Sequence, residues 1–111
     1  ILGHPTGRLL LSRHPYPLDV EAMLVRAAER KVAVEINADP KRMDLDWRHL
    51  RRARELGVTI VIGPDAHSVK QLDYVFGGVG MARKGGLEAK DILNTRDADA
   101  VVAFARAPRL Q

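Results

Sequence analysis

"VTIVIGPDAHS", residues 58–68, joins an uninterrupted apolar run to a turn that carries a carboxylate and an imidazole. The run Val58–Ile62 is rich in β-branched residues, which is typical of a strand in a parallel sheet covered on both faces. A Gly-Pro pair then breaks the pattern. Parallel β/α folds gather functional groups at the carboxyl ends of their strands. Asp65 and His67 therefore stand where such a fold would place a site.

Two further segments end in the same way. Val32–Ile36 predicts a second strand, and Asn37 follows it directly. Ile1–Leu2 has the pattern of a strand end whose start would precede the chain, and His4 follows it. Because the carboxyl ends of parallel strands meet at one edge of a sheet, we expect these side chains to share a rim with the acid and imidazole of the first segment.

Helices are predicted between the strands. Asp19 is a candidate N-cap, and apolar residues at positions 20, 23, 24 and 27 have the period of a half-buried helix that ends at Lys31. Asp46 is expected to cap a second helix that ends at Gly57. This second helix is expected to turn three residues inward: Trp47, Leu50 and Ala53.

The last third of the chain has a weaker pattern. Residues 69–76 have helical spacing, glycines at 77, 78 and 80 are expected to interrupt it, and 79–83 are expected to start another short segment. Leu87–Leu93 and Ala98–Ala105 are predicted as two final helices, with Thr95 or Asp97 as the cap of the second. The strict alternation with short connections predicts an α/β fold in which parallel strands alternate with helices.

Length and composition limit the class of protein. The chain has 111 residues, enough for one domain, and 46% of them are hydrophobic, enough for a core. No run approaches the ~20 apolar residues that cross a bilayer. Cysteine is absent, which excludes disulfides and thiolate metal sites and leads us to expect a cytoplasmic protein.

Positive charge is modest overall but locally concentrated. The formal net charge is +4, and a dense basic run lies between positions 41 and 54. Two interpretations remain open: a solvated helix face, or a contact with the phosphates of a nucleic acid. The run contains six cations: Lys41, Arg42, Arg48, Arg51, Arg52 and Arg54.

The residues at the predicted rim suit a metal ion. A carboxylate oxygen beside a neutral imidazole nitrogen is a donor set for a divalent transition metal. Such ions lower the pKa of a bound water and stabilise a phosphoryl oxygen. The plain alternatives are that Asp65 caps a turn or helix and that His67 is simply solvated.

Five blocks of sequence also have a familiar order. They are GHPTGRLLLSR (3–13), VEINADPKRMDLDWRHLRRARELGV (34–58), DAHS (65–68), GVGMARKGGL (78–87) and ILNT (92–95). Together they resemble the C-terminal part of the polymerase-and-histidinol-phosphatase (PHP) domain, as found in bacterial family X DNA polymerases. The resemblance implies a distorted (β/α)7 barrel that hydrolyses phosphoesters with up to three divalent ions, zinc or manganese before magnesium. It also implies 3′–5′ exonuclease activity and DNA-end processing in repair.

The resemblance assigns roles residue by residue. It implies that three residues bind metal and carry catalysis: His4, Asp65 and His67. Glu35 and Asn37, on the "EIN" strand, are expected to support the rim. From their charge and position, and not from the resemblance, five cations are expected to hold DNA: Arg8 in the "GHPTGR" loop, with Arg13, Lys41, Arg42 and Arg48.

The early ligands of that family are missing from these residues. A His-x-His pair, further histidines and an acidic ligand would precede Ile1, so residues 1–111 are expected to be the C-terminal half of a PHP domain, completed by an N-terminal remainder and a polymerase core. The chain alone is expected to be inactive. The alternatives are a small-molecule phosphatase of the histidinol-phosphate type, a non-catalytic remnant that binds DNA or acts as a scaffold, and a β/α domain unrelated to metals.

Overall fold

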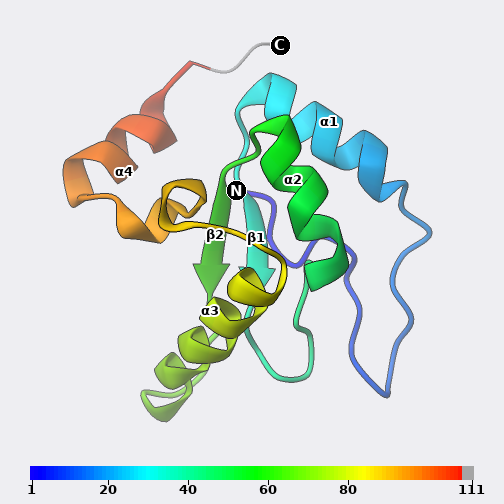
Figure 1. Ribbon diagram of the computed structural model, residues 1–111. Helices are drawn as coiled ribbons and strands as arrows, with labels where there is room; N and C mark the ends of the chain where they lie inside the picture. The colour runs from blue at the N-terminus through cyan, green and yellow to red at the C-terminus, as the bar shows by residue number, and fades with distance from the viewer. Residues whose placement is uncertain (109–111) are drawn as a thin grey trace.

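The computed structural model describes residues 1–108 as parallel strands alternating with helices (Figure 1). The strands are β1 (Val34–Asn37) and β2 (Ile60–Gly63). The α-helices are α1 (Val20–Arg30), α2 (Leu50–Leu56), α3 (Val75–Lys84) and α4 (Ala98–Arg106). Four short 3-10 helices complete the described elements: η1 (Trp47–His49), η2 (Lys70–Tyr74), η3 (Ala89–Asp91) and η4 (Leu93–Thr95).

The two strands run parallel, with Val34 opposite Ile60 at one end of the register. Each edge of this pair is extended by a single parallel bridge, from Leu2 to Val34 on one side and from Ile92 to Ile60 on the other. The spatial order of the four extended segments is therefore their order along the chain. This arrangement confirms the predicted α/β alternation and the strand-like end at Ile1–Leu2. Both predicted strands are confirmed with their bounds shifted one or two residues toward the carboxyl end.

One face of the sheet carries the core. Its side chains, from Val34 and Ile36 on β1 and from Ile60 and Ile62 on β2, are at most 6% exposed. They pack against α1, α2 and α3, and Figure 1 shows α1 and α2 side by side. The opposite face carries half-buried Glu35 and Val61. The prediction of a sheet covered on both faces is therefore wrong for the described residues, which supply helices to one face.

Local capping signals are borne out. The Asp19 carboxylate accepts the Ala22 amide at the start of α1, and the Asp97 carboxylate accepts the Ala100 amide at the start of α4. Gly57 ends α2 in the left-handed region, at φ 79°. These interactions lie within three residues of the cap, so the sequence specifies them directly. No helix among the described residues is long and apolar enough to cross a membrane.

The glycines of α3 do not interrupt the helix, which corrects the prediction for residues 77–83. A Cβ at position 78 would overlap the Cγ2 methyl of Ile62 and lie 3.0 Å from the Cβ of Ala38. Gly78 is therefore required for close approach between α3 and the strands, and the packing gained there offsets the low helix propensity of glycine.

The prediction of a helix over residues 87–93 is also wrong. This segment is extended at Ile92 and forms η3 and η4 on either side of it. The Asn94 side chain then accepts the Ile62 amide at 2.8 Å and donates to the Ile62 carbonyl at 2.9 Å. An asparagine amide thus takes the place of a further backbone ladder along the edge of β2.

Candidate functional site at the carboxyl end of the strands

Asp65 lies in the turn after β2, where Asn37 from the end of β1 reaches it. Asn37 is 1% exposed and donates its Nδ2 to Asp65 Oδ2 at 3.2 Å. The Arg42 Nε lies 3.8 Å from the same oxygen. Among residues 1–108, no hydrogen bond or ion pair engages Asp65 Oδ1. The carboxylate is therefore oriented by one oxygen and has the other available to a cation.

His67 is exposed and its ring is oriented by the same turn. Its Nδ1 lies 2.8 Å from the Asp65 carbonyl oxygen, and its backbone amide donates to Gln71 Oε1 at 2.8 Å. A carbonyl can only accept, so Nδ1 donates this hydrogen bond, and in the neutral ring Nε2 then carries the lone pair. This tautomer, fixed by a hydrogen bond on the far nitrogen, is the form in which imidazole binds a metal.

His4 lies on the other side of β1, after the bridge at Leu2. Its backbone amide donates to Glu35 Oε1 at 3.0 Å, and its side chain is exposed. The Glu35 carboxylate lies between two glycines: a Cβ on Gly3 would be 3.7 Å from Oε1, and a Cβ on Gly63 would be 2.5 Å from Oε2. Glu35 therefore occupies the middle of the rim, between the segment of His4 and the segment of Asp65.

The spacing of the strands limits what these residues can share. Leu2 and β2 flank β1, so the chain segments of His4 and Asp65 are separated by two strand spacings, roughly 10 Å. This spacing separates the backbones, and side chains that reach inward from both segments can bind one ion or neighbouring ions about 4 Å apart. Within residues 1–108, no group of three or more His, Cys, Asp or Glu side chains could by itself hold a metal ion.

Two of the predicted ligands have unusual backbone conformations. The φ of His4 is 25° and that of Asp65 is 52°, in a region that side-chain-bearing residues rarely adopt. Such residues persist where the surrounding structure holds them, and they cluster at functional sites. Leu11, Lys31 and Met43, outside the predicted ligand set, share a positive φ, so this backbone conformation marks tight turns of the chain as well as the predicted ligands.

A buried carboxylate holds the loop that carries His4. Asp44 is 0% exposed, and it accepts the amides of Thr6 and Gly7, each at 3.0 Å from Oδ2. Asp44 also pairs through its backbone with Asn37. The loop after β1 is thus joined by hydrogen bonds to the loop that carries His4.

Arg8 was predicted to contact a phosphate, but its side chain also holds two loops together. Its Nη1 donates to Asp46 Oδ2 at 3.0 Å and its Nε to the Arg42 carbonyl at 2.8 Å, while Nη2 donates to the Met43 carbonyl. The Arg48 hydrogen bond to Asp46, with further help from the Arg48 amide and Arg8, holds the pKa of Asp46 well below its usual value. Asp46 therefore stays ionised and joins the loop of Arg8 to the start of η1.

The other predicted DNA contacts differ in how free they are. Arg13 donates twice to the Gly7 carbonyl, at 2.9 and 2.7 Å, and so closes its own loop. Arg48 is 71% exposed although it pairs with Asp46 at 2.8 Å. The Lys41 side chain is exposed and has no partner among the described residues. Lys41 and Arg48 are therefore the cations best placed to reach a ligand in solvent.

Three contributions were missed by reasoning from the sequence. Asp44 was given no role, Asp46 was predicted only as a helix cap, which its bond from the Arg48 amide confirms, and Arg42 was assigned to DNA although it faces Asp65. The available signal was their spacing: acids at 44 and 46, two positions apart, can direct both side chains toward the same neighbouring loop. Trp47 also corrects a prediction: it is 36% exposed, whereas Leu50 and Ala53 are buried. The tighter turn of η1 rotates the indole out of the core.

Comparison with known proteins identifies relatives along nearly the whole chain, although no family model matches it. The chain is 44% identical over 106 residues to the DNA polymerase/3'-5' exonuclease PolX of Bacillus subtilis (strain 168), which covers 96% of the chain and 19% of the relative. It is 36% identical over 72 residues to proteins named as probable phosphatases in Shewanella strains ANA-3 and MR-4, covering 56% of the chain and 29% of each relative. The chain thus spans about a fifth of the polymerase and less than a third of each phosphatase.

Proposed function

Since the chain is homologous to the C-terminal, PHP-like phosphatase portion of the DNA polymerase/3'-5' exonuclease PolX, we propose that it forms part of a metal-dependent phosphoesterase that removes nucleotides from the 3′ ends of DNA during repair. The activity belongs to the complete protein, in the cytoplasm of a bacterial cell. Residues 1–111 contribute the C-terminal half of its (β/α)7 barrel, and a polymerase core accompanies it.

The free Oδ1 of Asp65 and the lone pair on His67 Nε2, two residues apart in one turn, carry this proposal. With His4 on the far side of β1, they would hold divalent ions, zinc or manganese before magnesium, in a cluster of up to three. When bound, these ions would lower the pKa of a water, which makes hydroxide available as the nucleophile, and would place positive charge beside the phosphoryl oxygens. Asn37 fixes Asp65, and Glu35 fixes the backbone of His4.

The basic loop beside this rim would hold the DNA backbone. Lys41 and Arg48 are exposed, and Arg42 lies 3.8 Å from Asp65, close to where the scissile phosphate would bind. Arg8 and Arg13 keep the adjoining loop in place through their hydrogen bonds and add positive charge. Contacts of this kind are independent of base sequence and weaken as salt rises.

The ligand set of the described residues is incomplete, so the chain alone would be inactive. His4, Asp65 and His67 are three ligands on two flanks of one strand, and a cluster of ions needs further donors. A site that lacks most of its ligands binds metal weakly. The N-terminal remainder of the polypeptide would supply the other strands and their ligands.

The test uses the full-length protein, stripped of metal and reloaded with Mn²⁺, Zn²⁺ or Mg²⁺. Asp65→Asn and His67→Ala are expected to reduce bound metal by about one ion and to slow hydrolysis of 5′-labelled DNA at least a hundredfold, with circular dichroism unchanged. His14→Ala is the control, because His14 is an exposed histidine outside the rim. Unchanged metal content and activity in both rim variants would exclude the proposed site and favour a non-catalytic DNA-binding or scaffolding role.

The similarity to probable phosphatases favours a second candidate, a PHP-type phosphatase that acts on small phosphate monoesters. The same residues would bind the same ions, so only the substrate differs. Competition between a short DNA strand and a monoester such as histidinol phosphate separates the two. If the monoester is turned over faster and DNA does not compete, the phosphatase is the better assignment.

A further inference from the structure

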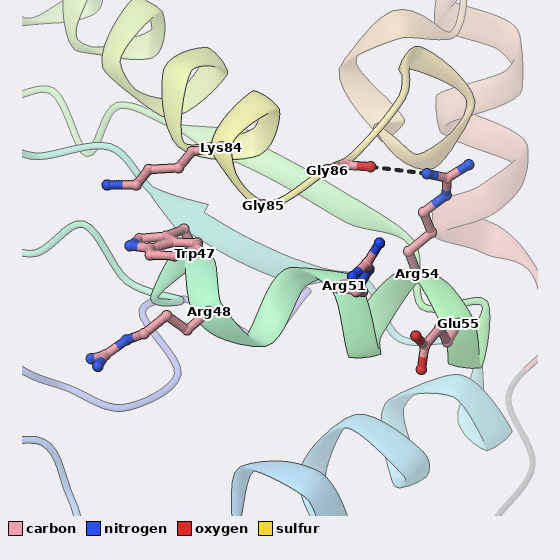
Figure 2. Close-up of a pocket in the computed structure, with 8 residues that line it drawn as sticks. All are labelled: Trp47, Arg48, Arg51, Arg54, Glu55, Lys84, Gly85 and Gly86. Carbon is pink, nitrogen blue, oxygen red and sulfur yellow. Dashed lines mark hydrogen bonds between the residues drawn. The ribbon is translucent and has the colours of Figure 1, made fainter.

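A groove on the helical surface lies apart from the rim residues. It has a volume of about 600 Å³, in the range of ligand pockets, and runs between η1–α2 and the end of α3 (Figure 2). Gly85 lies at its floor, where a Cβ would come within 2.6 Å of Leu50, so a glycine is required for α3 to end this close to α2. The side chains around it are Trp47, Arg48, Arg51, Arg54, Glu55 and Lys84.

The only tryptophan of the chain forms one end of this groove. Trp47 is 36% exposed, and the Lys84 Nζ lies 4.7 Å from the centre of its ring (Figure 2). An exposed cation–π contact is weaker than the stacking of a nucleobase on an indole. A base can therefore displace the ammonium, which would then be free to pair with a neighbouring phosphate.

The charge that remains uncompensated in the groove is positive. The charge of Arg54 is compensated within the protein, because its side chain donates to the Gly86 carbonyl and pairs with Glu88 at 3.0 Å. Among residues 1–108, the Arg51 side chain has no hydrogen bond or ion pair, and the Lys84 side chain has only its contact with the indole. The acid of the groove, Glu55, pairs with Arg52 at 3.5 Å. The groove thus offers an aromatic face flanked by two cations that no acid neutralises.

We propose that this groove binds single-stranded DNA, with one base stacked on Trp47 and the adjoining phosphates held by Arg51 and Lys84. A stacked aromatic between cations is the general solution for binding a single strand without sequence preference. A duplex keeps its bases stacked on one another and offers no free base face, which is why we commit to a single strand. Trp47 begins the helical segment that follows the loop from the end of β1. This inference deepens the proposed function, because it gives the strand being degraded a second point of attachment.

The first test is local and needs no catalysis. A single-stranded oligonucleotide carrying 5-iodouracil is crosslinked by light to the full-length protein without metal, and the tryptic peptides are identified by mass spectrometry. The nucleotide is expected on the peptide spanning residues 43–48, which contains Trp47. An excess of unlabelled single strand should remove the crosslink, whereas duplex of the same sequence should not. No crosslink on this peptide would overturn the proposal, and equal competition by a mononucleotide would assign the groove to free nucleotides instead.

The second test measures affinity and its dependence on salt. Trp47→Ala is expected to weaken single-strand binding about tenfold, and Trp47→Phe to retain most of it. Arg51→Gln with Lys84→Gln should reduce the slope of log K against log salt by about 1.4, since each lost phosphate contact to a single strand removes about 0.7. Arg26→Gln is the control, an arginine 63% exposed on α1 outside the groove. An unchanged slope in the double variant would refute binding in the groove. If the rim variants Asp65→Asn and His67→Ala lose hydrolysis but still crosslink, the groove binds DNA independently of the metal site, which separates the two proposals.

Discussion

Two glycines of α3, two positions apart, should respond in opposite ways to the same substitution. At position 78 an alanine Cβ would overlap the Cγ2 methyl of Ile62 and lie 3.0 Å from the Cβ of Ala38, whereas carbons in contact are ordinarily about 3.5–4.0 Å apart. At position 80 no atom outside the helix's own nearby backbone would lie within 4 Å of the added Cβ. Gly78→Ala is therefore expected to destabilise the protein, and Gly80→Ala to stabilise it.

The magnitudes follow from two effects. Alanine in place of glycine inside a helix gains about 1 kcal/mol at both positions, because the unfolded chain loses freedom. At position 78 the strands and α3 must also separate, and overpacking of a well-packed core costs about 1–3 kcal/mol. The Cβ at position 78 would meet two side chains, Ile62 on β2 and Ala38 directly after β1. We therefore take the upper part of that range, about 2–3 kcal/mol. The two variants should then differ by about 2–3 kcal/mol, with Gly80→Ala about 1 kcal/mol more stable than the parent.

Urea unfolding followed by circular dichroism gives both free energies of unfolding. The consequence reaches the rim, because Ile62 is three residues before Asp65 on the same segment. Metal binding by the full-length Gly78→Ala variant should weaken in parallel, while Gly80→Ala should bind metal as the parent does. Equal stability of the two variants would show that α3 does not pack on β2 as described and would refute the reasoning.

Three further substitutions test the contacts that shape the rim. Asp44→Ala leaves two buried amides without an acceptor and should cost about 2–4 kcal/mol in urea unfolding, with weaker metal binding by the full-length protein. Asn94→Ala removes two hydrogen bonds to Ile62 and should cost about 1–2 kcal/mol; faster hydrogen exchange confined to β2 would locate the loss. The hydrogen bond from Arg48 lowers the pKa of Asp46 in the folded state, so its contribution is complete above the ordinary pKa of about 4 and is lost as the pH falls below it. Asp46→Asn should therefore flatten the fall in unfolding free energy between about pH 4 and pH 2, and an unchanged pH profile would contradict this assignment.

The parts of the fold that the sequence predicts are those decided by residues close together in the chain. Asp19 and Asp97 cap their helices through amides three residues away, and Gly57 ends α2 by its own left-handed conformation. The strand after Gly57 is read correctly to within two residues because an apolar β-branched run has few other uses. Such features survive without knowledge of the tertiary structure.

The errors arise where packing overrides local preference. Glycines at 77, 78 and 80 lower the helix propensity of α3, but Gly78 fills a position where a side chain would meet β2. Residues 87–93 have helical spacing, yet Ile92 is extended because it pairs with Ile60 on the edge of the sheet. Neither partner could be found from the periodicity of the segment itself.

The candidate site shows the same division. That Asp65 and His67 follow a strand could be read from eleven residues, and the structure places Asn37 against that acid as the order of strands implies. The partners of the arginines could not be read, because a long side chain can choose among acids far away in sequence: Arg8 and Asp46 are 38 positions apart. Charge density therefore predicted a basic surface, but it did not separate cations that hold loops together from cations that remain free.

That separation has a consequence for how the rim would work. A ligand that must be ordered when the metal arrives gives up binding free energy to that ordering, whereas one already held by its neighbours does not. Asp65 is held by Asn37, the imidazole of His67 by the Asp65 carbonyl, and the loop of His4 by a buried carboxylate that carries no ligand role. The Asp65 carboxylate and the His67 imidazole are thus oriented by hydrogen bonds within residues 1–108, and His4 is held through its backbone. The elements that complete the cluster would then need to add donors but would not need to shape this half of the site.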